Sequence, residues 1–198
     1  MNAPVDSFPR LRDWLAGKPR QPSADADEPP LRAELFSADQ MATHGKRLAA
    51  SHTTLARGRV RDRLLARLAD NERVLVDVCR QLTEAVADKR RVTPAGEWLL
   101  DNFYLLEEQV RMARSLLPEG YSRALPRLVD SPTEPGAPRV YDIALETVSH
   151  GDGRVDAESL GRFVTAYQTV TALELGELWA IPIMLRLAVI ENLRRVSV

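Results

Sequence analysis

The chain has 198 residues, of which 44% are hydrophobic, and its formal net charge is −1. A chain of this length and composition can build one folded domain. The near-neutral charge argues against a nucleic-acid partner held by a basic surface, and the single cysteine excludes a disulfide within the chain. The first residues lack the continuous apolar core of a signal peptide, so we expect a cytoplasmic protein.

Residues 1–36 are predicted to form a disordered leader ahead of a helical domain over residues 37–198. Proline recurs at positions 4, 9, 19, 22, 29 and 30, with serine and aspartate between them. Such a segment buries too little apolar surface to offset the entropy lost on ordering. Phe8, Leu11, Trp14 and Leu15 have helical spacing, so the alternative is a short segment that docks on a neighbour.

Two apolar patterns predict a helical hairpin over residues 37–90. Ser37 is a suitable N-cap, and positions 41, 45, 48, 52 and 55 form one helical stripe after it. A second stripe runs from Val60 to Val86 and would span about 45 Å as a helix. Because Gly58 lies between the patterns and permits a tight reversal, the two helices are expected to pack against each other.

Residues 94–198 are predicted to be helical, with short connections. Thr93 followed by Pro94 is typical of a helix start, and this helix should run to about Leu116. Further helices are expected over about 139–149 and 157–170, the second capped by Asp156. A capping box of Thr171 and Glu174 should begin the last helix. No alternating pattern is long enough to predict a strand, so the expected fold class is all-α, a helical bundle.

The last helix is apolar enough to suggest a membrane segment. However, its longest uncharged stretch runs only from Leu178 to Leu185, whereas a spanning helix needs about 20 apolar residues. Arg186 would also be costly inside a bilayer. The sequence therefore predicts a central helix surrounded by others, with Trp179 buried and important for stability. If the helix instead docks on a domain outside this chain, Trp179 would be largely exposed here and its loss nearly silent.

Glu177, Trp179 and Arg186 are the candidates for a functional contact. A charge on a mostly apolar helix has to reach water or an opposite charge. Glu177 and Arg186 are nine residues apart, too far to pair along one helix. Each partner therefore lies on another helix of this chain or on a further domain, and we mark all three residues as an interdomain contact.

No pattern predicts a catalytic, cofactor or metal site. Residues 148–159 contain the glycine turn of a calcium-binding EF-hand loop but lack its main ligands, including the closing glutamate. His44, His52 and His150 show no metal-ligand spacing. Cys79 lies on an apolar stripe, as a buried thiol would. We therefore expect no cofactor, no metal and no activity from this chain alone.

Six sequence motifs follow one another in the second half of the chain. They occupy residues 98–111, 117–121, 124–128, 138–141, 162–168 and 176–186. In this order they resemble the N-terminal region of bacterial cyclic β-1,2-glucan synthases. The resemblance covers residues 94–196, roughly half of the chain, and residues 1–92 resemble the family only loosely.

The resemblance implies one part of a very large inner-membrane glycosyltransferase that uses UDP-glucose. Such synthases carry membrane helices, a transferase domain with Asp-x-Asp-type metal ligands and a phosphorylase-like part, for which this sequence offers no matching positions. No catalytic residue is therefore carried over. The implied role is a non-catalytic accessory segment that packs on the cytoplasmic transferase part, so that its membrane association is only indirect.

A stand-alone helical module that binds a protein partner is the alternative from another class. Both readings need an exposed apolar surface on the folded chain. A clean monomer without such a surface would weigh against either of them.

Overall fold

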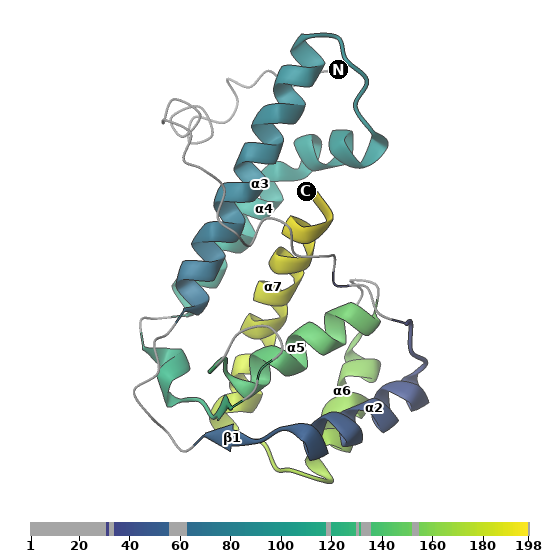
Figure 1. Cartoon of the computed structure of the whole chain (residues 1–198), viewed down its shortest axis with the longest axis vertical. Coiled ribbons are helices and arrows are strands. Elements are labelled where there is room, and N and C mark those ends of the chain that lie inside the picture. Colours follow the sequence, from purple (N-terminus) through teal and green to yellow (C-terminus); the bar gives the residue numbers. More distant parts are fainter. Residues whose placement is uncertain are drawn as a thin grey trace.

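The computed structural model describes residues 31, 34–55, 63–117, 120–129, 131, 136–151 and 155–197. Most of the predicted leader and the predicted reversal at Gly58 lie outside these residues. Within the described part the fold is all-α, as predicted (Figure 1). The α-helices are α2 (Ala38–Ser51), α3 (Leu64–Ala87), α4 (Pro94–Leu116), α5 (Arg139–His150), α6 (Ala157–Gln168) and α7 (Leu175–Ser197), and a 3₁₀ turn spans Tyr121–Ala124.

One short antiparallel ladder accompanies the helices. Strand β1 (Thr54–Leu55) pairs with β2 (Arg127–Leu128), with Thr54 opposite Leu128 and Leu55 opposite Arg127. Two residues on each side are too few to leave an alternating pattern in the sequence. The ladder fixes the chain that leaves α2 beside the segment that enters α5.

Three helix starts agree with the predicted caps. Ser37 and Gln40 form a capping box before α2, and the Thr93 hydroxyl accepts a hydrogen bond from the Gly96 amide at the start of α4. The Asp156 carboxylate accepts a hydrogen bond from the Ser159 amide at 2.8 Å before α6. These bonds satisfy amides that the first helical turn leaves without a partner.

The start of α7 differs from the prediction. The helix begins at Leu175, and the Glu177 carboxylate accepts a hydrogen bond from the Glu174 amide at 2.8 Å. The Thr171 hydroxyl instead donates to the Ala49 carbonyl of α2 at 3.4 Å. In the expected capping box, the Thr171 hydroxyl would accept a hydrogen bond from the Glu174 amide. The Glu177 carboxylate, in the first turn of the observed helix, accepts that bond instead.

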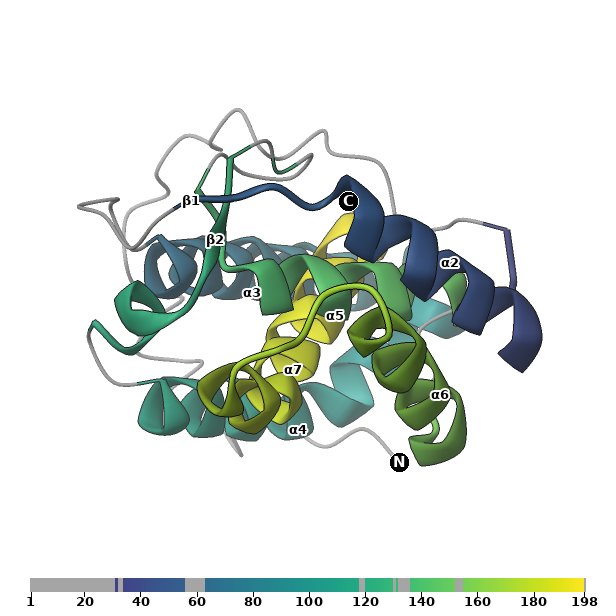
Figure 2. The same ribbon diagram turned by 90° about the horizontal axis from the view of Figure 1, so that it is seen from below.

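Two hydrophobic clusters make up the interior of the described part of the chain. The larger one joins α3, α4, α5 and α7, and the smaller one joins α2 and α6 around Ile143 of α5. Figure 1 shows α3 and α4 side by side at one end of the molecule, while α2 and α6 lie at the other end. Figure 2 shows α5 between the α2–α6 pair and the rest of the bundle. Helix α5 therefore connects the two clusters, and almost all of its residues are buried.

The helices of the predicted 37–90 hairpin pack on different partners. Helix α2 lies along α6, whereas α3 lies along α4 and α7. Gly45 permits the first of these contacts, because a Cβ at that position would lie 2.8 Å from the Phe163 carbonyl oxygen. The stripe of α2 was identified correctly, but it is covered by α6. A helical hairpin occurs one element later, between α3 and α4.

None of the helices in the described part of the chain is long and apolar enough to cross a membrane. For α7, this agrees with the expectation from its interrupted apolar run.

Candidate functional site

Glu177 has its partner within this chain. Its carboxylate is fully buried and accepts hydrogen bonds from Arg139 of α5, at 2.9 Å from Nε and 2.5 Å from Nη2. Arg139 also donates to the Ala172 carbonyl at 3.2 Å. Burial alone would lower the pKa of Arg139, but the hydrogen bonds and negative charge of Glu177 raise it above its usual value. This pair joins α5 to α7, so Glu177 is not available as a surface contact.

Trp179 lies on the outer face of α7. Its side chain is 75% exposed, so the prediction of a buried central tryptophan was wrong. The helix turns Ala180, Met184 and Ala188 inward instead, at the spacing of a single helix face. The apolar residues of α7 cover most of its circumference, and the pattern alone could not indicate which side was covered.

Arg186 lies at the surface between α4 and α7. It is half-buried, and its Nε donates a hydrogen bond to Oε1 of Gln109 on α4 at 2.8 Å. Of the three predicted contact residues, Trp179 and Arg186 thus reach the outer face of α7, whereas Glu177 points into the core.

A groove between α4 and α7, the α4–α7 groove, surrounds Arg186. Its volume is about 490 Å³. Its lining is mainly apolar and comprises Trp98, Leu99, Asn102, Leu105, Leu106, Gln109, Val155, Pro182, Leu185, Arg186, Val189, Ile190 and Leu193. Trp98 is 58% exposed at the groove, and Val189 and Leu105 are also exposed.

Exposed apolar residues continue from the groove along both helices. On α7, Leu175 and Trp179 precede Pro182 and Val189 at spacings of one or two turns. On α4, Met112 and Leu116 follow Leu105 in the same way. Contiguous exposed apolar surface of this kind marks sites of protein association more often than chance exposure does.

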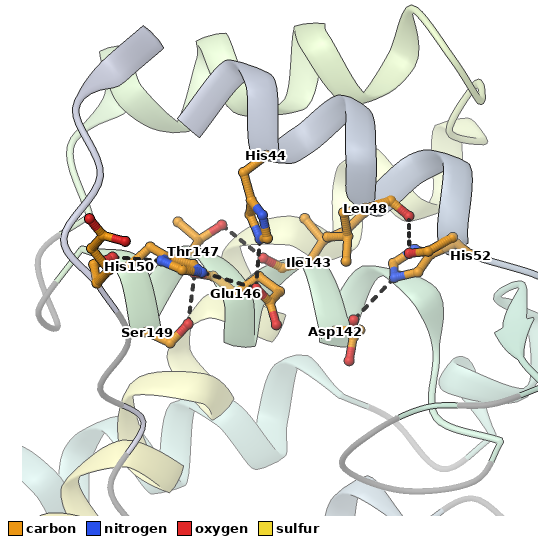
Figure 3. Close-up of polar contacts among 11 residues, drawn as sticks. His44, Leu48, His52, Asp142, Ile143, Glu146, Thr147, Ser149 and His150 are labelled. Atoms are coloured by element: carbon orange, nitrogen blue, oxygen red, sulfur yellow. Dashed lines mark hydrogen bonds and ion pairs between the residues drawn. The ribbon is translucent and has the colours of Figure 1, made fainter. Parts of the chain in front are cut away.

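A row of histidine contacts lies between α2 and α5 (Figure 3). At one end of the row, Nδ1 of His52 is 2.8 Å from the Tyr167 hydroxyl, and Nε2 is 3.1 Å from Oδ2 of Asp142. Burial raises the pKa of Tyr167 to about 12, so its hydroxyl stays protonated beside His52. Both nitrogens of His52 are therefore engaged, and the group is buried away from solvent.

His44, Glu146 and His150 meet at the other end of this row. Oε2 of Glu146 is 2.7 Å from Nε2 of His44 and 3.3 Å from Nε2 of His150. The side chains are partly accessible, with 17% of His44, 27% of Glu146 and 10% of His150 exposed. Analysis of the histidines alone missed this group. The detectable signal was Glu146 four residues before His150, which places both on one face of a helix.

A second buried carboxylate, Glu191, holds α7 against α3. It accepts hydrogen bonds from Arg67 at 2.6 and 2.9 Å and from Asn71 at 2.7 Å, and Arg194 and Arg195 add two more from α7 itself. Burial would raise the pKa of Glu191, but the hydrogen bonds and charge of Arg67 and Arg195 hold it well below its usual value.

The comparison with curated proteins relates this chain to a bacterial enzyme of glucan synthesis. The chain is similar to part of the cyclic β-(1,2)-glucan synthase NdvB of Rhizobium meliloti (strain 1021), with 35% identity over 182 residues. The match covers 91% of this chain and 6% of that synthase. The predicted resemblance is therefore confirmed, and it reaches well beyond residues 94–196 into the first half of the chain. No family model matches.

Proposed function

We propose that this chain acts as a non-catalytic N-terminal helical accessory segment of a cyclic β-1,2-glucan synthase. It packs on the cytoplasmic, UDP-glucose-dependent transferase part of that enzyme, and the α4–α7 groove is the docking surface. The observation that carries the proposal is an exposed apolar groove on a segment that matches only a small fraction of a much longer synthase.

The chemistry of the groove favours a protein occupant. Trp98 and Val189 offer exposed apolar surface, and tryptophan is enriched among residues that dominate binding energy. Arg186 places one positive charge in this otherwise apolar lining. An apolar segment of the synthase that carries an acidic residue opposite Arg186 would complement both features.

The buried ionic groups support a structural role. Glu177 and Glu191 are the fully buried carboxylates among the described residues, and arginines bind both of them. Arginine donors occupy both carboxylates, which leaves neither of them a free geometry for proton transfer. Purified chain incubated with UDP-glucose and Mg²⁺ or Mn²⁺ should release no more UDP than a boiled control.

A chimeric synthase tests the docking proposal. The matching segment of R. meliloti NdvB is replaced by this chain, and cyclic glucan is measured in cells that lack their own synthase. Trp98→Asp and Val189→Asp are then introduced at the groove. Val170→Asp, at an exposed residue after α6, is the matched control. Far-UV circular dichroism and melting of the isolated variants establish that each one folds.

We expect the chimera and its Val170→Asp control to make glucan, and both groove variants to lose most of it. Full glucan synthesis by folded groove variants would overturn the docking surface. An inactive chimera would overturn the accessory role. If the purified chain instead self-associates through the groove, the alternative of a stand-alone interaction module is favoured; light scattering on wild-type and Trp98→Asp protein measures this.

A further inference from the structure

We propose that His44, Glu146 and His150 form a binding site for a divalent transition-metal ion of the Zn²⁺ class. The two imidazole Nε2 atoms and one Glu146 carboxylate oxygen would be the protein ligands, and a water molecule would take the fourth position. Two histidines and one carboxylate are a ligand set that Zn²⁺ accepts with tetrahedral geometry. The site is separate from the α4–α7 groove and does not depend on the proposed accessory role.

The distances fit such an ion after small side-chain movements. The three ligand atoms lie within 4.8 Å of one another. Ligands about 2.0–2.2 Å from a tetrahedral metal are separated by about 3.3–3.6 Å. The separation between Glu146 and His150, 3.3 Å, already has this value, and that between Glu146 and His44, 2.7 Å, has to widen slightly. The third separation, between the two histidine nitrogens, is at most 4.8 Å and has to reach about 3.3–3.6 Å by side-chain rotation.

The hydrogen bond on the far side of His150 orients its ring for metal binding. Nδ1 of His150 is 2.7 Å from the Glu34 carbonyl oxygen, which only accepts hydrogen bonds, so Nδ1 carries the proton. Metal-binding histidines commonly donate their second ring N–H to a backbone carbonyl in this way. Phe36 stacks on the His150 ring at a centroid distance of 3.9 Å and fixes its plane.

This hydrogen bond leaves Nε2 of His150 as the ring nitrogen that faces the Glu146 carboxylate, 3.3 Å away. Nε2 of His44 lies 2.7 Å from the same carboxylate oxygen. Two imidazole nitrogens and one carboxylate oxygen therefore converge on one point, as the ligands of a metal ion do.

Space for a fourth ligand is available beside His150. A pocket of about 310 Å³ is bordered by His150, Phe36, Val155, Asp156 and Ser159 among others. Neighbouring His52 is excluded as a ligand because Asp142 and Tyr167 occupy both of its nitrogens. The proposed site would thus tie α2 to α5 through three protein ligands with one position accessible from solvent.

Titration of the full chain tests this proposal. Protein treated with EDTA and dialysed is titrated with Zn²⁺ by calorimetry, and Co²⁺ is added separately while visible absorption is recorded. We expect one Zn²⁺ per chain and the intense visible bands of four- or five-coordinate Co²⁺. His44→Gln, Glu146→Gln and His150→Gln should each weaken Zn²⁺ binding by about tenfold or more, given that even the loss of supporting residues costs 10–100-fold. Glu158→Gln, at an exposed carboxylate on α6, should leave binding unchanged.

Absence of stoichiometric Zn²⁺ binding, together with a Co²⁺ spectrum as weak as that of its aqua ion, would overturn the proposal. Equal affinity in wild-type protein and folded ligand variants would overturn it as well. If a variant fails to fold, the wild-type Co²⁺ spectrum still decides. A bound metal should also raise the melting temperature of wild-type protein and of Glu158→Gln.

Discussion

At the scale of single residues, two carboxylates determine which side of α7 faces the core. Glu177 and Glu191 lie about four helical turns apart, and each receives an arginine from another element, Arg139 from α5 and Arg67 from α3. Leaving either carboxylate buried without its arginine would be strongly unfavourable. The two ion pairs therefore fix the rotation of α7 about its axis, because its apolar residues cover most of the circumference and do not specify one buried face. In this rotation Trp179 faces outward.

Trp179→Ala should change the free energy of unfolding by no more than about 0.5 kcal/mol, because exposed side chains contribute little to stability. Phe163→Ala, at a fully buried aromatic residue, should lose about 3–5 kcal/mol. Urea denaturation of both variants against wild type measures the difference. A loss at Trp179 as large as that at Phe163 would contradict the outward position of the tryptophan.

The Cys79 thiol should resist alkylation in the folded protein. Burial, with a smaller effect of the Glu107 charge, raises its pKa to about 12, so that only about one molecule in ten thousand carries a thiolate at pH 8. Iodoacetamide labelling followed by mass spectrometry should show slow modification in buffer and rapid modification in guanidinium chloride. Rapid labelling of the native chain would contradict the position of Cys79 in the core.

At the scale of elements, the contact between α2 and α6 depends on a missing side chain. Gly45 lies against the backbone of Phe163, whereas no atom of the described residues lies within 4 Å of where a Cβ of Gly161 on α6 would be. Both glycines occupy helix interiors, where alanine is intrinsically preferred by up to about 1 kcal/mol. Alanine substitutions at the two positions therefore distinguish the effect of helix propensity, which both share, from the effect of packing, which arises only at Gly45.

Gly45→Ala should destabilise the chain by about 1–3 kcal/mol, because the new methyl group forces α2 away from α6. Gly161→Ala should leave stability unchanged or raise it by up to about 1 kcal/mol. Denaturation midpoints of the two variants provide the measurement. Similar changes of the same sign at both positions would show that α2 does not approach α6 as closely as described.

At the scale of the whole molecule, ion pairs bind the two ends of α7 to different parts of the fold. The Glu177 pair fastens its start to α5, and the Glu191 group fastens its end to α3. Because the folded-state pKa of Glu191 lies below its unfolded value, this group stabilises the fold above about pH 4.5. Its contribution is lost progressively as the pH falls below that value and the unfolded chain takes up protons first.

Glu191→Gln should therefore lower the melting temperature clearly at pH 7, and the gap to wild type should narrow at about pH 3. Asp88→Asn removes an exposed carboxylate, whose ionic partner among the described residues is exposed Arg90, and should have little effect at either pH. Thermal melts across this pH range provide the comparison. A gap that stays constant down to pH 3 would show that Glu191 does not carry the acid dependence.

Local signals in the sequence predicted most of the elements, because a cap or an apolar stripe depends on neighbouring residues. Ser37, Thr93 and Asp156 cap helices where expected. A stripe shows that one face of a helix is buried but not what covers it, so α6 could not be identified as the partner of α2. Of the histidine group, only the Glu146–His150 pair left a local signal: His44 and Glu146 are 102 residues apart, and the fold brings them together.

The pairing of α2 with α6 has a consequence for synthesis on the ribosome. Helix α2 emerges early, yet its covering helix follows only after α3, α4 and α5 have been made. At about 5–20 residues per second, the roughly 100 intervening residues take about 5–20 s to translate. During that interval the apolar face of α2 lacks α6, its main native cover, while α3 and α4 can already pair as neighbours. The newborn chain is thus exposed to aggregation or chaperone capture at α2 until α6 has been made.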